Sequence, residues 1–410
     1  MGYLELDLSL SDEDQAIRDL SRQFAAEVIR PAGIELDRLA DPADVIGERS
    51  RFWDLVREFR ELDFHRVALP KAVGGMAEDY SPLARAIMVE ELSHGDVGVT
   101  ASLFVSNFTF GLAALCEDPE IRAWAREYCE DTEGRLVGCW AITEPDHGSD
   151  WWFGAEAASA DGKCAPSLRA VRKGDEYVLN GQKSAWVSNG TIATHALLNV
   201  SLDPKRGMQG TGVAVLPLDL PGISRGKPLD KMGMRALNQG EIIFEDVKIP
   251  RKYMVVEDPS IASVVIETTL NHGNMGVGMA FTGLAQAALD ETVAYAKDRV
   301  QGGVPIFEHK NVKLKLFRMY TLVEASRAYL RRIAAYNAAT PPLGSTPHAR
   351  SIKIFSTETA LQVASEAVQI FGGIGLSKES LIEKLFRDAR AGTIADGDNE
   401  ALALVGAGYL

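Results

Sequence analysis

Residues 135–150 read RLVGCWAITEPDHGSD, and the periodicity of the chain changes within this stretch. Upstream, apolar residues recur at intervals of three and four, which is the spacing of amphipathic helices. Downstream, short segments rich in β-branched residues are separated by Gly, Pro, Asp and Asn, which is typical of strands joined by turns. The stretch therefore predicts a change from a helical domain to a β domain near residue 135.

The first 134 residues are predicted to form the helical domain. Apolar residues return at helical spacing in four segments, namely 8–33, 50–64, 81–95 and 118–132. Ser11 is expected to cap the first of these helices, because three acidic residues follow it, and Pro31 is expected to lie near its end. Breaks are expected at 69–75 and in the Gly- and Phe-containing segment around residue 108.

Residues 135–250 are predicted to form the β domain, and residues 251–410 a second helical domain. The strand-like segments are 135–144, 177–190, 194–202, 211–218 and 241–250. Residues 151–170 are rich in small residues and are expected to form a surface loop. Long helical segments with short breaks predict an antiparallel four-helix bundle at 262–300, 309–339, 348–373 and 379–391. The predicted fold is mostly α with a central β domain.

The composition argues against several classes of function. The chain of 410 residues has 43 Lys and Arg against 57 Asp and Glu, a net charge of −14. Nucleic-acid binding is not expected, because it needs clustered cations. The four cysteines have no C-x-x-C spacing, so free thiols in a reducing cytoplasm are expected. No stretch approaches eighteen uninterrupted apolar residues, so no membrane association is expected.

Metal and nucleotide sites of familiar spacing are not predicted either. None of the seven histidines stands at a ligand spacing from another His, Cys or carboxylate, so no metal is expected. The glycine-rich runs at 273–283 and 369–375 match neither a dinucleotide-binding loop nor a P-loop. The glycines of the first run are expected to let helices pack closely.

Two strand ends carry groups that suit a planar ligand. Thr143 and Ser149 belong to the turn TEPDHGSD after one strand, and Trp186 and Ser188 follow another. Hydroxyls and free backbone N–H groups at such a rim are able to hydrogen-bond a heterocycle. The alternative is that the aromatic residues are buried and only fill the core of the β domain.

Six motifs stand in one order along the chain: TEPDHGSD (143–150), WVSNG (186–190), KMGMRALNQGEIIFEDVKIP (231–250), DRVQGGVPIFEHKNV (298–312), QIFGGIGLSKESLIEKLFRDAR (369–390) and DGDNE (396–400). With these motifs in register, the chain resembles the acyl-CoA dehydrogenase family over nearly its whole length. The resemblance implies an N-terminal helical domain, a β-barrel-like middle domain and a C-terminal four-helix bundle. It also implies FAD bound without a covalent link, usually in a homotetramer.

The resemblance implies two groups of FAD contacts. The flavin ring would be held by Trp140, Ile142, Thr143, Ser149, Trp186 and Ser188. The adenosine end would be held across a subunit interface by Arg299, Gln301, His309 and Lys310 of one chain and by Gln369, Gly372 and Gly373 of another. Gln301 and Gly302 replace a hydroxyl and an aromatic residue that are common in the family, and Lys310 replaces a glutamine.

Oxidation of an acyl thioester between Cα and Cβ needs a base for the α-proton, a clamp on the carbonyl and an acceptor for the β-hydride. FAD supplies the acceptor at flavin N5, and a carboxylate serves as the base when the acyl chain expels water from around it. By resemblance the base is Asp396, whose backbone N–H would form half of the carbonyl clamp. Gly397 would allow a close turn beside the flavin. The earlier-helix position that some members use for the base is Gly273.

Asp396 stands where most members have glutamate. Its carboxylate is set back by one C–C bond, about 1.5 Å, and a displacement of about 1 Å at a reacting group costs on the order of 100-fold in rate. Two minorities of the superfamily share this aspartate, the dehydrogenases of cyclic acyl-CoAs and the nitroalkane oxidases. The oxidases pair it with an arginine about two helical turns later, where this chain has Ala403. We therefore expect thioester oxidation, with a cyclic or branched acyl-CoA as a substrate that suits the shorter base.

Three alternatives stay open at this point: a nitroalkane-oxidase-like flavin oxidase or monooxygenase, a dehydrogenase of acyl groups on an acyl-carrier protein, and a silent acyl-CoA binder. The carrier is open because Asn271 and Asn274 stand where many members have Asp and Arg for the CoA arm, which leaves Arg235 as a candidate for the arm. Ser149 matches a residue near the thioester.

Two further acids follow the base. Asp398 and Glu400 replace common Thr and Gln. Asp398 is a candidate for cofactor contact, whereas both acids also suit the start of a helix, where the macrodipole favours negative charge. The electron acceptor implied by the resemblance is an electron-transfer flavoprotein.

Overall fold

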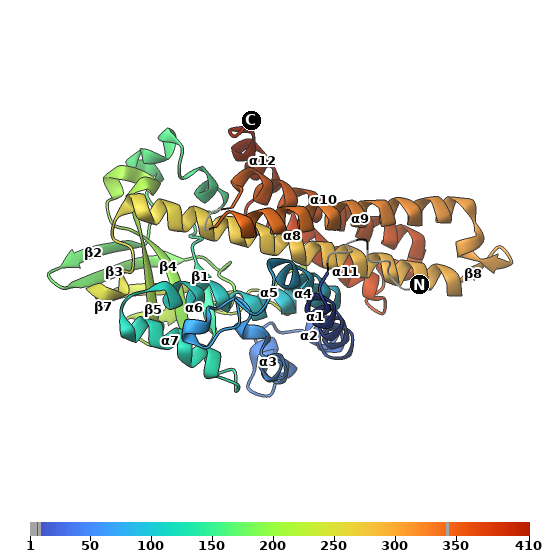
Figure 1. Cartoon of the computed structure of the whole chain (residues 1–410), viewed down its shortest axis with the longest axis horizontal. Helices are drawn as coiled ribbons and strands as arrows, with labels where there is room; N and C mark the ends of the chain where they lie inside the picture. Colours follow the sequence, from blue (N-terminus) through green and yellow to red (C-terminus); the bar gives the residue numbers. More distant parts are fainter. Residues whose placement is uncertain (1–5, 7–9, 342–343) are drawn as a thin grey trace.

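Three domains follow one another along the chain in the computed structural model, which describes residue 6 and residues 10–341 and 344–410. Figure 1 shows the strands of the middle domain at one end of the molecule, the N-terminal helices (blue to teal) below the long C-terminal helices, and those long helices reaching to the opposite end, where β8 lies. The predicted class, mostly α with a central β domain, is confirmed. The predicted divisions at 134/135 and 250/251 fall between the last N-terminal helix and the first strand, and at the end of the last long strand.

The described part of the N-terminal domain forms α1 (Asp12–Phe24), α2 (Arg30–Asp37), α3 (Arg51–Glu61), α4 (Pro82–Gly95), α5 (Val97–Phe104), α6 (Ser106–Leu115) and α7 (Pro119–Glu130). Ser11 caps α1 as predicted: its hydroxyl accepts from the Asp14 N–H, and the Asp14 carboxylate accepts from the Ser11 N–H, each across 3.1 Å. The expected stop near Pro31 is wrong, because a π-helical turn at Ala25–Ile29 leads into α2, which continues to Asp37. Proline lacks only a donor that the start of a helix does not need, so it is tolerated there.

The segment around residue 108 is not the expected break, since it lies inside α6. Phe110 is fully buried, and so is much of α5. A helix that is buried on most sides needs no polar face, so the periodicity that identifies surface helices is missing here. By length and composition Val97–Leu115 is apolar enough to cross a membrane, but 61% of its most apolar part is buried inside the protein, as in the core helix of a globular domain.

The middle domain is built on one sheet of β1 (Gly138–Ala141), β2 (Arg169–Lys173), β3 (Glu176–Lys183), β4 (His195–Ser201), β5 (Thr211–Pro217), β6 (Ile223–Arg225) and β7 (Ile242–Pro250). The order is β1-β4-β2-β3-β7-β6, and β5 pairs with β4 outside this path. β1 and β4 are parallel, with Trp140 opposite Leu197. The Ser184 N–H donates to the Thr143 carbonyl across 2.9 Å, so the ends of β1 and β3 meet at one rim of the sheet.

The loop that follows β1 is only partly a surface feature. It contains short 3-10 helices at Ser149–Phe153, Ala157–Ala160 and Gly162–Cys164. Trp151 and Trp152 are buried, contrary to the expected surface loop, because both indoles pack into the core of the middle domain. Trp152 Nε1 also donates to Asn274 Oδ1 across 3.4 Å, which anchors the loop to the C-terminal domain.

The C-terminal domain contains α8 (Pro259–Asp298), α9 (Lys310–Ala339), α10 (Thr346–Phe371), α11 (Leu381–Gly392) and α12 (Asn399–Ala407), with a hairpin of β8 (Val300–Gln301) and β9 (Val304–Pro305) between α8 and α9. α8 packs against α9, α10 and α11 and also against α4 (Figure 1). Gly283 permits the contact with α4, since an added Cβ would lie 2.1 Å from the Glu90 carbonyl oxygen. The expectation of close packing at this glycine run is confirmed.

Candidate active site

Asp396 lies in the loop between α11 and α12. Its backbone is left-handed, with φ of 49°, and Gly397 follows with φ of 100°. The Asn399 N–H donates to the Thr393 carbonyl across 3.1 Å and closes the loop. A residue other than glycine pays about 1–2 kcal/mol for this conformation, so contacts around the loop must hold it.

The carboxylate of Asp396 faces α8 and the middle domain. A Cβ added to Gly273 would lie 3.2 Å from Asp396 Oδ2 and 3.5 Å from Trp140 Cζ3. The carboxylate, the α8 backbone and the Trp140 indole therefore meet at one place. The two sequence positions considered for a base, Asp396 and Gly273, lie opposite each other.

The surroundings of Asp396 change its acidity. The residue as a whole is exposed, but its carboxylate is partly buried against the α8 backbone and the Trp140 indole. This burial raises the pKa of the Asp396 carboxyl, and the positive charge of Lys353 opposes the rise without cancelling it. A raised pKa makes the carboxylate a better proton acceptor.

Three side chains from three different elements hold the loop. Asn274 Nδ2 of α8 donates to the Asp396 carbonyl across 2.8 Å. Lys353 Nζ of α10 donates to the Gly397 carbonyl across 2.5 Å. Ser149 Oγ, from the loop after β1, accepts from the Asp398 N–H across 3.0 Å. The structure thus brings the predicted residues Ser149 and Asn274 to the base.

Lys353 was not singled out from the sequence. Its side chain is fully buried, although lysine is rarely buried without partners. The available signal was a lysine within an otherwise helical, apolar-rich segment at 348–373, which by itself does not indicate a role.

Asp398 and Glu400 begin α12. Asp398 Oδ1 accepts from the Glu400 N–H across 3.0 Å and from the Ala401 N–H across 3.2 Å, which makes Asp398 the N-cap. Glu400 lies in the first turn and is exposed. The helix-start interpretation of both acids is confirmed, and the cofactor contact of Asp398 stays a prediction.

The rim formed by the ends of β1 and β3 carries the residues expected around a planar ring. Trp140 is buried, and its Nε1 donates to Asn199 Oδ1 across 3.1 Å. Trp186 is different, because 59% of its surface is exposed. Gln239 Nε2 donates to Ser188 Oγ across 3.3 Å and to the Trp186 carbonyl across 3.0 Å. Trp140 is partly a core residue, as in the alternative considered above, whereas Trp186 presents an uncovered indole.

A buried ion pair supports this rim and was also not singled out from the sequence. Lys183 Nζ lies 2.8 Å from Glu144 Oε1 and 3.0 Å from the Ile142 carbonyl oxygen. Glu144 also accepts from the N–H of Leu168 across 3.3 Å. These bonds join the end of β1 to the end of β3 and to the start of β2, and so fix Ile142 and Thr143 at the rim.

The residues predicted for the adenosine end lie at the opposite end of the C-terminal domain. His309 Nε2 lies 2.9 Å from the Gln301 carbonyl oxygen in the β8–β9 hairpin. The Tyr295 and Phe371 rings stack with centroids 4.0 Å apart, so the end of α8 lies beside the end of α10. The structure therefore brings two predicted sets together, namely Arg299, Gln301, His309 and Lys310 with Gln369, Gly372 and Gly373, and it separates both from the rim.

Two predicted substrate residues make their contacts within the protein. Asn271 Nδ2 donates to Thr346 Oγ1 across 2.8 Å. Arg235 donates to the carbonyls of Asp37 and Leu39, across 3.1 and 2.7 Å, and joins the middle domain to the N-terminal helices. These contacts lend no support to a role with CoA, which stays a prediction for both residues.

Metal-ligating side chains do not gather in the described part of the chain: no group of three or more His, Cys, Asp or Glu residues there is placed to hold an ion. The four cysteines are free. Burial raises the pKa of the Cys139 thiol to about 12, so this cysteine is not a reactive thiolate at neutral pH.

Comparison with known proteins gives the family. Models of the N-terminal, middle and C-terminal domains of acyl-CoA dehydrogenase match residues 11–130, 139–247 and 263–408. The short-chain specific acyl-CoA dehydrogenase of Rattus norvegicus mitochondria is 31% identical over 98% of this chain and 91% of that protein. The chain belongs to the acyl-CoA dehydrogenase family.

Two other acyl-CoA dehydrogenases bear on the site. The cyclohex-1-ene-1-carbonyl-CoA dehydrogenase of Geobacter metallireducens is 31% identical over 97% of each chain. The structure of butyryl-CoA dehydrogenase from Megasphaera elsdenii matches with a TM-score of 0.86 and 28% identity, covering 98% of this chain and 99% of that one. The fold is the acyl-CoA dehydrogenase fold, and the protein is an oxidoreductase that dehydrogenates an acyl-CoA.

The rim suits the flavin that acyl-CoA dehydrogenases use. Trp186 leaves its indole uncovered at a rim that also carries the Thr143 and Ser188 hydroxyls. A planar aromatic group placed there would cover apolar surface and meet hydrogen-bonding groups at its edge. The residues present therefore fit the cofactor.

Proposed function

We propose that the protein is an FAD-dependent acyl-CoA dehydrogenase in which Asp396 removes the α-proton of the thioester. The position of Asp396 carries the proposal: a left-handed turn directs its carboxylate to the place where Gly273 and Trp140 meet. Burial raises the pKa of this carboxyl, which favours acceptance of a proton. A bound acyl chain would displace the remaining water around the carboxyl and raise its pKa further.

Asp396 acts through two of its groups. Its carboxylate takes the proton from Cα, and the electron pair of that C–H bond becomes the second bond between Cα and Cβ as the β-hydrogen leaves as hydride. Its backbone N–H donates to the thioester carbonyl and stabilises the negative charge that develops on the oxygen. Bound FAD supplies the acceptor for the hydride. The product is the α,β-unsaturated thioester.

The flavin ring would be held at the rim by Trp140, Ile142, Thr143, Ser149, Trp186 and Ser188. The adenosine end would be held at the far end of another copy of the chain. Since the end of α8 lies beside the end of α10 within one chain, we propose that one copy supplies both adenosine sets, in place of the division between two chains that the resemblance implied. Gly273 and Arg299 stand about 26 residues apart on α8, which at about 1.5 Å per residue is roughly 39 Å. This distance exceeds the reach of one FAD molecule, so the ring contacts and the adenosine contacts belong to different copies. A homotetramer is the assembly that we propose.

A cyclic acyl-CoA is the substrate class that we propose. The shorter side chain of Asp396 places the carboxylate about 1.5 Å further back than a glutamate would, and the bulk of a ring brings Cα closer to it. Support comes from similarity to a relative described as acting on cyclohex-1-ene-1-carbonyl-CoA. A cytoplasmic enzyme with an electron-transfer flavoprotein as acceptor completes the proposal.

The test is bleaching of the flavin by a panel of straight, branched and cyclic acyl-CoAs under anaerobic conditions, with the wild type and Asp396→Asn. We expect the cyclic members to reduce the wild-type flavin fastest. Asp396→Asn is expected to keep FAD and to lose reduction by at least about 100-fold, since amide nitrogen and oxygen are poor bases. Reduction of the Asn variant at the wild-type rate would show that the base lies elsewhere.

The same panel separates the alternatives. Rapid reoxidation of the substrate-reduced flavin by oxygen would indicate an oxidase. If acyl groups on an acyl-carrier protein bleach the flavin and the same groups on CoA do not, the carrier of the substrate is the acyl-carrier protein. A flavin that no thioester reduces would indicate a silent binder.

A further inference from the structure

Lys353 is the most unusual of the groups that hold the catalytic loop, here defined as residues 393–398. It projects from α10, its side chain is fully buried, and its Nζ donates to the Gly397 carbonyl across 2.5 Å and to Asn399 Oδ1 across 2.7 Å. Asn399 Nδ2 in turn donates to Thr357 Oγ1, also on α10, across 3.1 Å. One lysine therefore ties the loop and the start of α12 to α10.

The acceptors of Lys353 are neutral, yet its charge faces acids. The charged groups that act on it are Asp396 and Asp398 of the catalytic loop and Glu358 on its own helix. The other two side chains that hold the catalytic loop, Asn274 of α8 and Ser149 of the loop after β1, are neutral. Hydrogen bonds to neutral carbonyls fix the position of the ammonium group, while the acids set its electrostatic effect.

We propose that Lys353 is a positioning residue for the reaction: it fixes the Gly397 carbonyl, and with it the direction of the Asp396 side chain and N–H, and its positive charge keeps Asp396 ionised until substrate arrives. This inference rests on the proposed role of Asp396 as the base. Lys353 does not touch the reacting atoms and acts only through the catalytic loop.

Two physical arguments support the proposal. Asp396 has a strained left-handed backbone, and such a residue persists only where neighbours fix it; Lys353 holds the carbonyl of the very next residue. In addition, burial raises the pKa of the Asp396 carboxyl, and Lys353 is the group that opposes the rise. Burial also lowers the pKa of Lys353 to about 8, against the pull of the three acids. The ammonium form therefore prevails at neutral pH.

The test separates the two effects with three variants of the holoenzyme. Lys353→Met removes charge and hydrogen bonds, Lys353→Gln removes the charge but keeps an N–H donor, and Lys353→Arg keeps the charge. Lys315→Met is the matched control, because Lys315 is a lysine of α9 in a half-exposed pair with Glu366. Hydrogen–deuterium exchange of residues 390–400 reports the loop, and the pH dependence of flavin reduction by an acyl-CoA reports the base.

In Lys353→Met we expect the backbone amides of the catalytic loop to exchange with deuterium faster than in the wild type. We also expect kcat to fall at least about 10-fold with little change in KM. Loss of the positive charge raises the pKa of Asp396, so the acidic limb of the kcat/KM profile, which reports the free enzyme, should move up by about 1 pH unit in Lys353→Met and Lys353→Gln. Lys353→Arg and Lys315→Met should keep the limb of the wild type. A merely structural lysine would lower activity without moving this limb.

Unchanged loop exchange together with an unmoved limb in the neutral variants would overturn the proposal. If Lys353→Met does not fold, Lys353→Gln decides the effect of charge. Should Asp396→Asn reduce its flavin at the wild-type rate, the role of the base fails instead, and loop exchange in Lys353→Met still decides whether Lys353 holds the loop.

Discussion

A side chain at residue 273 would be in tight contact with the Asp396 carboxylate. A Cβ at residue 273 would lie 3.2 Å from Asp396 Oδ2, which is tighter than an ordinary contact. We predict that Gly273→Ala displaces the carboxylate by a few tenths of an ångström and lowers the rate of flavin reduction several-fold, since a displacement of about 1 Å costs about 100-fold, whereas the melting temperature changes little. Stopped-flow reduction and thermal unfolding measure the two quantities.

Gly406→Ala is the control for this substitution. Gly406 is also a helical glycine, and a Cβ added there meets nothing within 4 Å. The Gly406→Ala variant should keep the wild-type rate of flavin reduction. Its free energy of unfolding should rise by about 0.5–1 kcal/mol, since alanine restricts the unfolded chain. Equal rates in the two variants would mean that the Asp396 carboxylate does not depend on the space at Gly273.

Asp396 also makes stability depend on pH. Because the folded protein raises the pKa of this carboxyl, the contribution of Asp396 is most favourable below its unfolded value of about 4 and is lost as pH rises through the folded value. We predict that Asp396→Asn melts at a higher temperature than the wild type at pH 7.5, and that the difference shrinks as the pH is lowered towards 5. Asparagine and aspartate both tolerate the left-handed backbone, so the substitution adds no backbone strain. A variant that melts below the wild type at every pH would contradict the prediction.

At the scale of elements, the start of α12 depends on its cap. Asp398 Oδ1 accepts two backbone N–H groups, and loss of such a cap costs about 1 kcal/mol. We predict that Asp398→Ala lowers the free energy of unfolding by this amount in denaturant titrations of the holoenzyme, and that Asp398→Ser restores most of it. Glu400→Gln, at an exposed position in the same turn, should have a much smaller effect. If Asp398→Ser keeps stability but releases flavin, Asp398 contacts the cofactor as well.

At the scale of the whole molecule, the distance between the rim and the far end of α8 makes FAD binding depend on assembly. α9 carries an uncovered apolar stripe, with Leu314, Phe317 and Tyr320 exposed by 51%, 66% and 43%. Further along the domain, Tyr336 and Phe355 are exposed by 53% and 36%. Stripes of this kind mark interfaces. We predict that Phe317→Asp, or strong dilution of the wild type, dissociates the subunits and releases FAD together.

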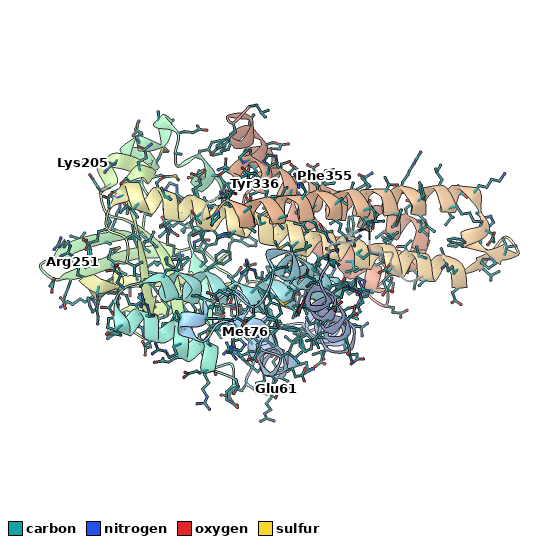
Figure 2. The ribbon with its side chains drawn as sticks, viewed as in Figure 1. Glu61, Met76, Lys205, Arg251, Tyr336 and Phe355 are labelled. Atoms are coloured by element: carbon teal, nitrogen blue, oxygen red, sulfur yellow. The ribbon has the colours of Figure 1, made fainter. Side chains whose placement is uncertain are left out.

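Size-exclusion chromatography with detection at flavin and protein wavelengths measures subunit dissociation and FAD release together. Lys205→Asp is the control, because Lys205 is exposed on the β domain, far from α9 (Figure 2); it should leave both assembly and flavin unchanged. A stable monomer that retains FAD would contradict cofactor sharing.

The sequence by itself determined whatever depends on neighbours along the chain or on ordered motifs. The caps at Ser11 and Asp398 are local hydrogen bonds between residues two or three positions apart, so their residue types suffice to predict them. The change from helices to strands near residue 135 follows from periodicity, and the order of six motifs indicates the family and the place of Asp396. These features need no knowledge of distant contacts.

Only the tertiary structure decided how the base is held. Asn274, Lys353 and Ser149 come from three separate elements to one loop, and no local pattern brings them together. The same reason explains the errors at residue 108 and at Trp151 and Trp152, because burial against distant segments removes the need for a polar face. The error at Pro31 has a local cause, since a π-helical turn leads into α2 just before this exposed proline. The periodicity of a sequence indicates which residues face water. The catalytic loop is instead fixed by contacts in the protein interior between segments that are distant along the chain.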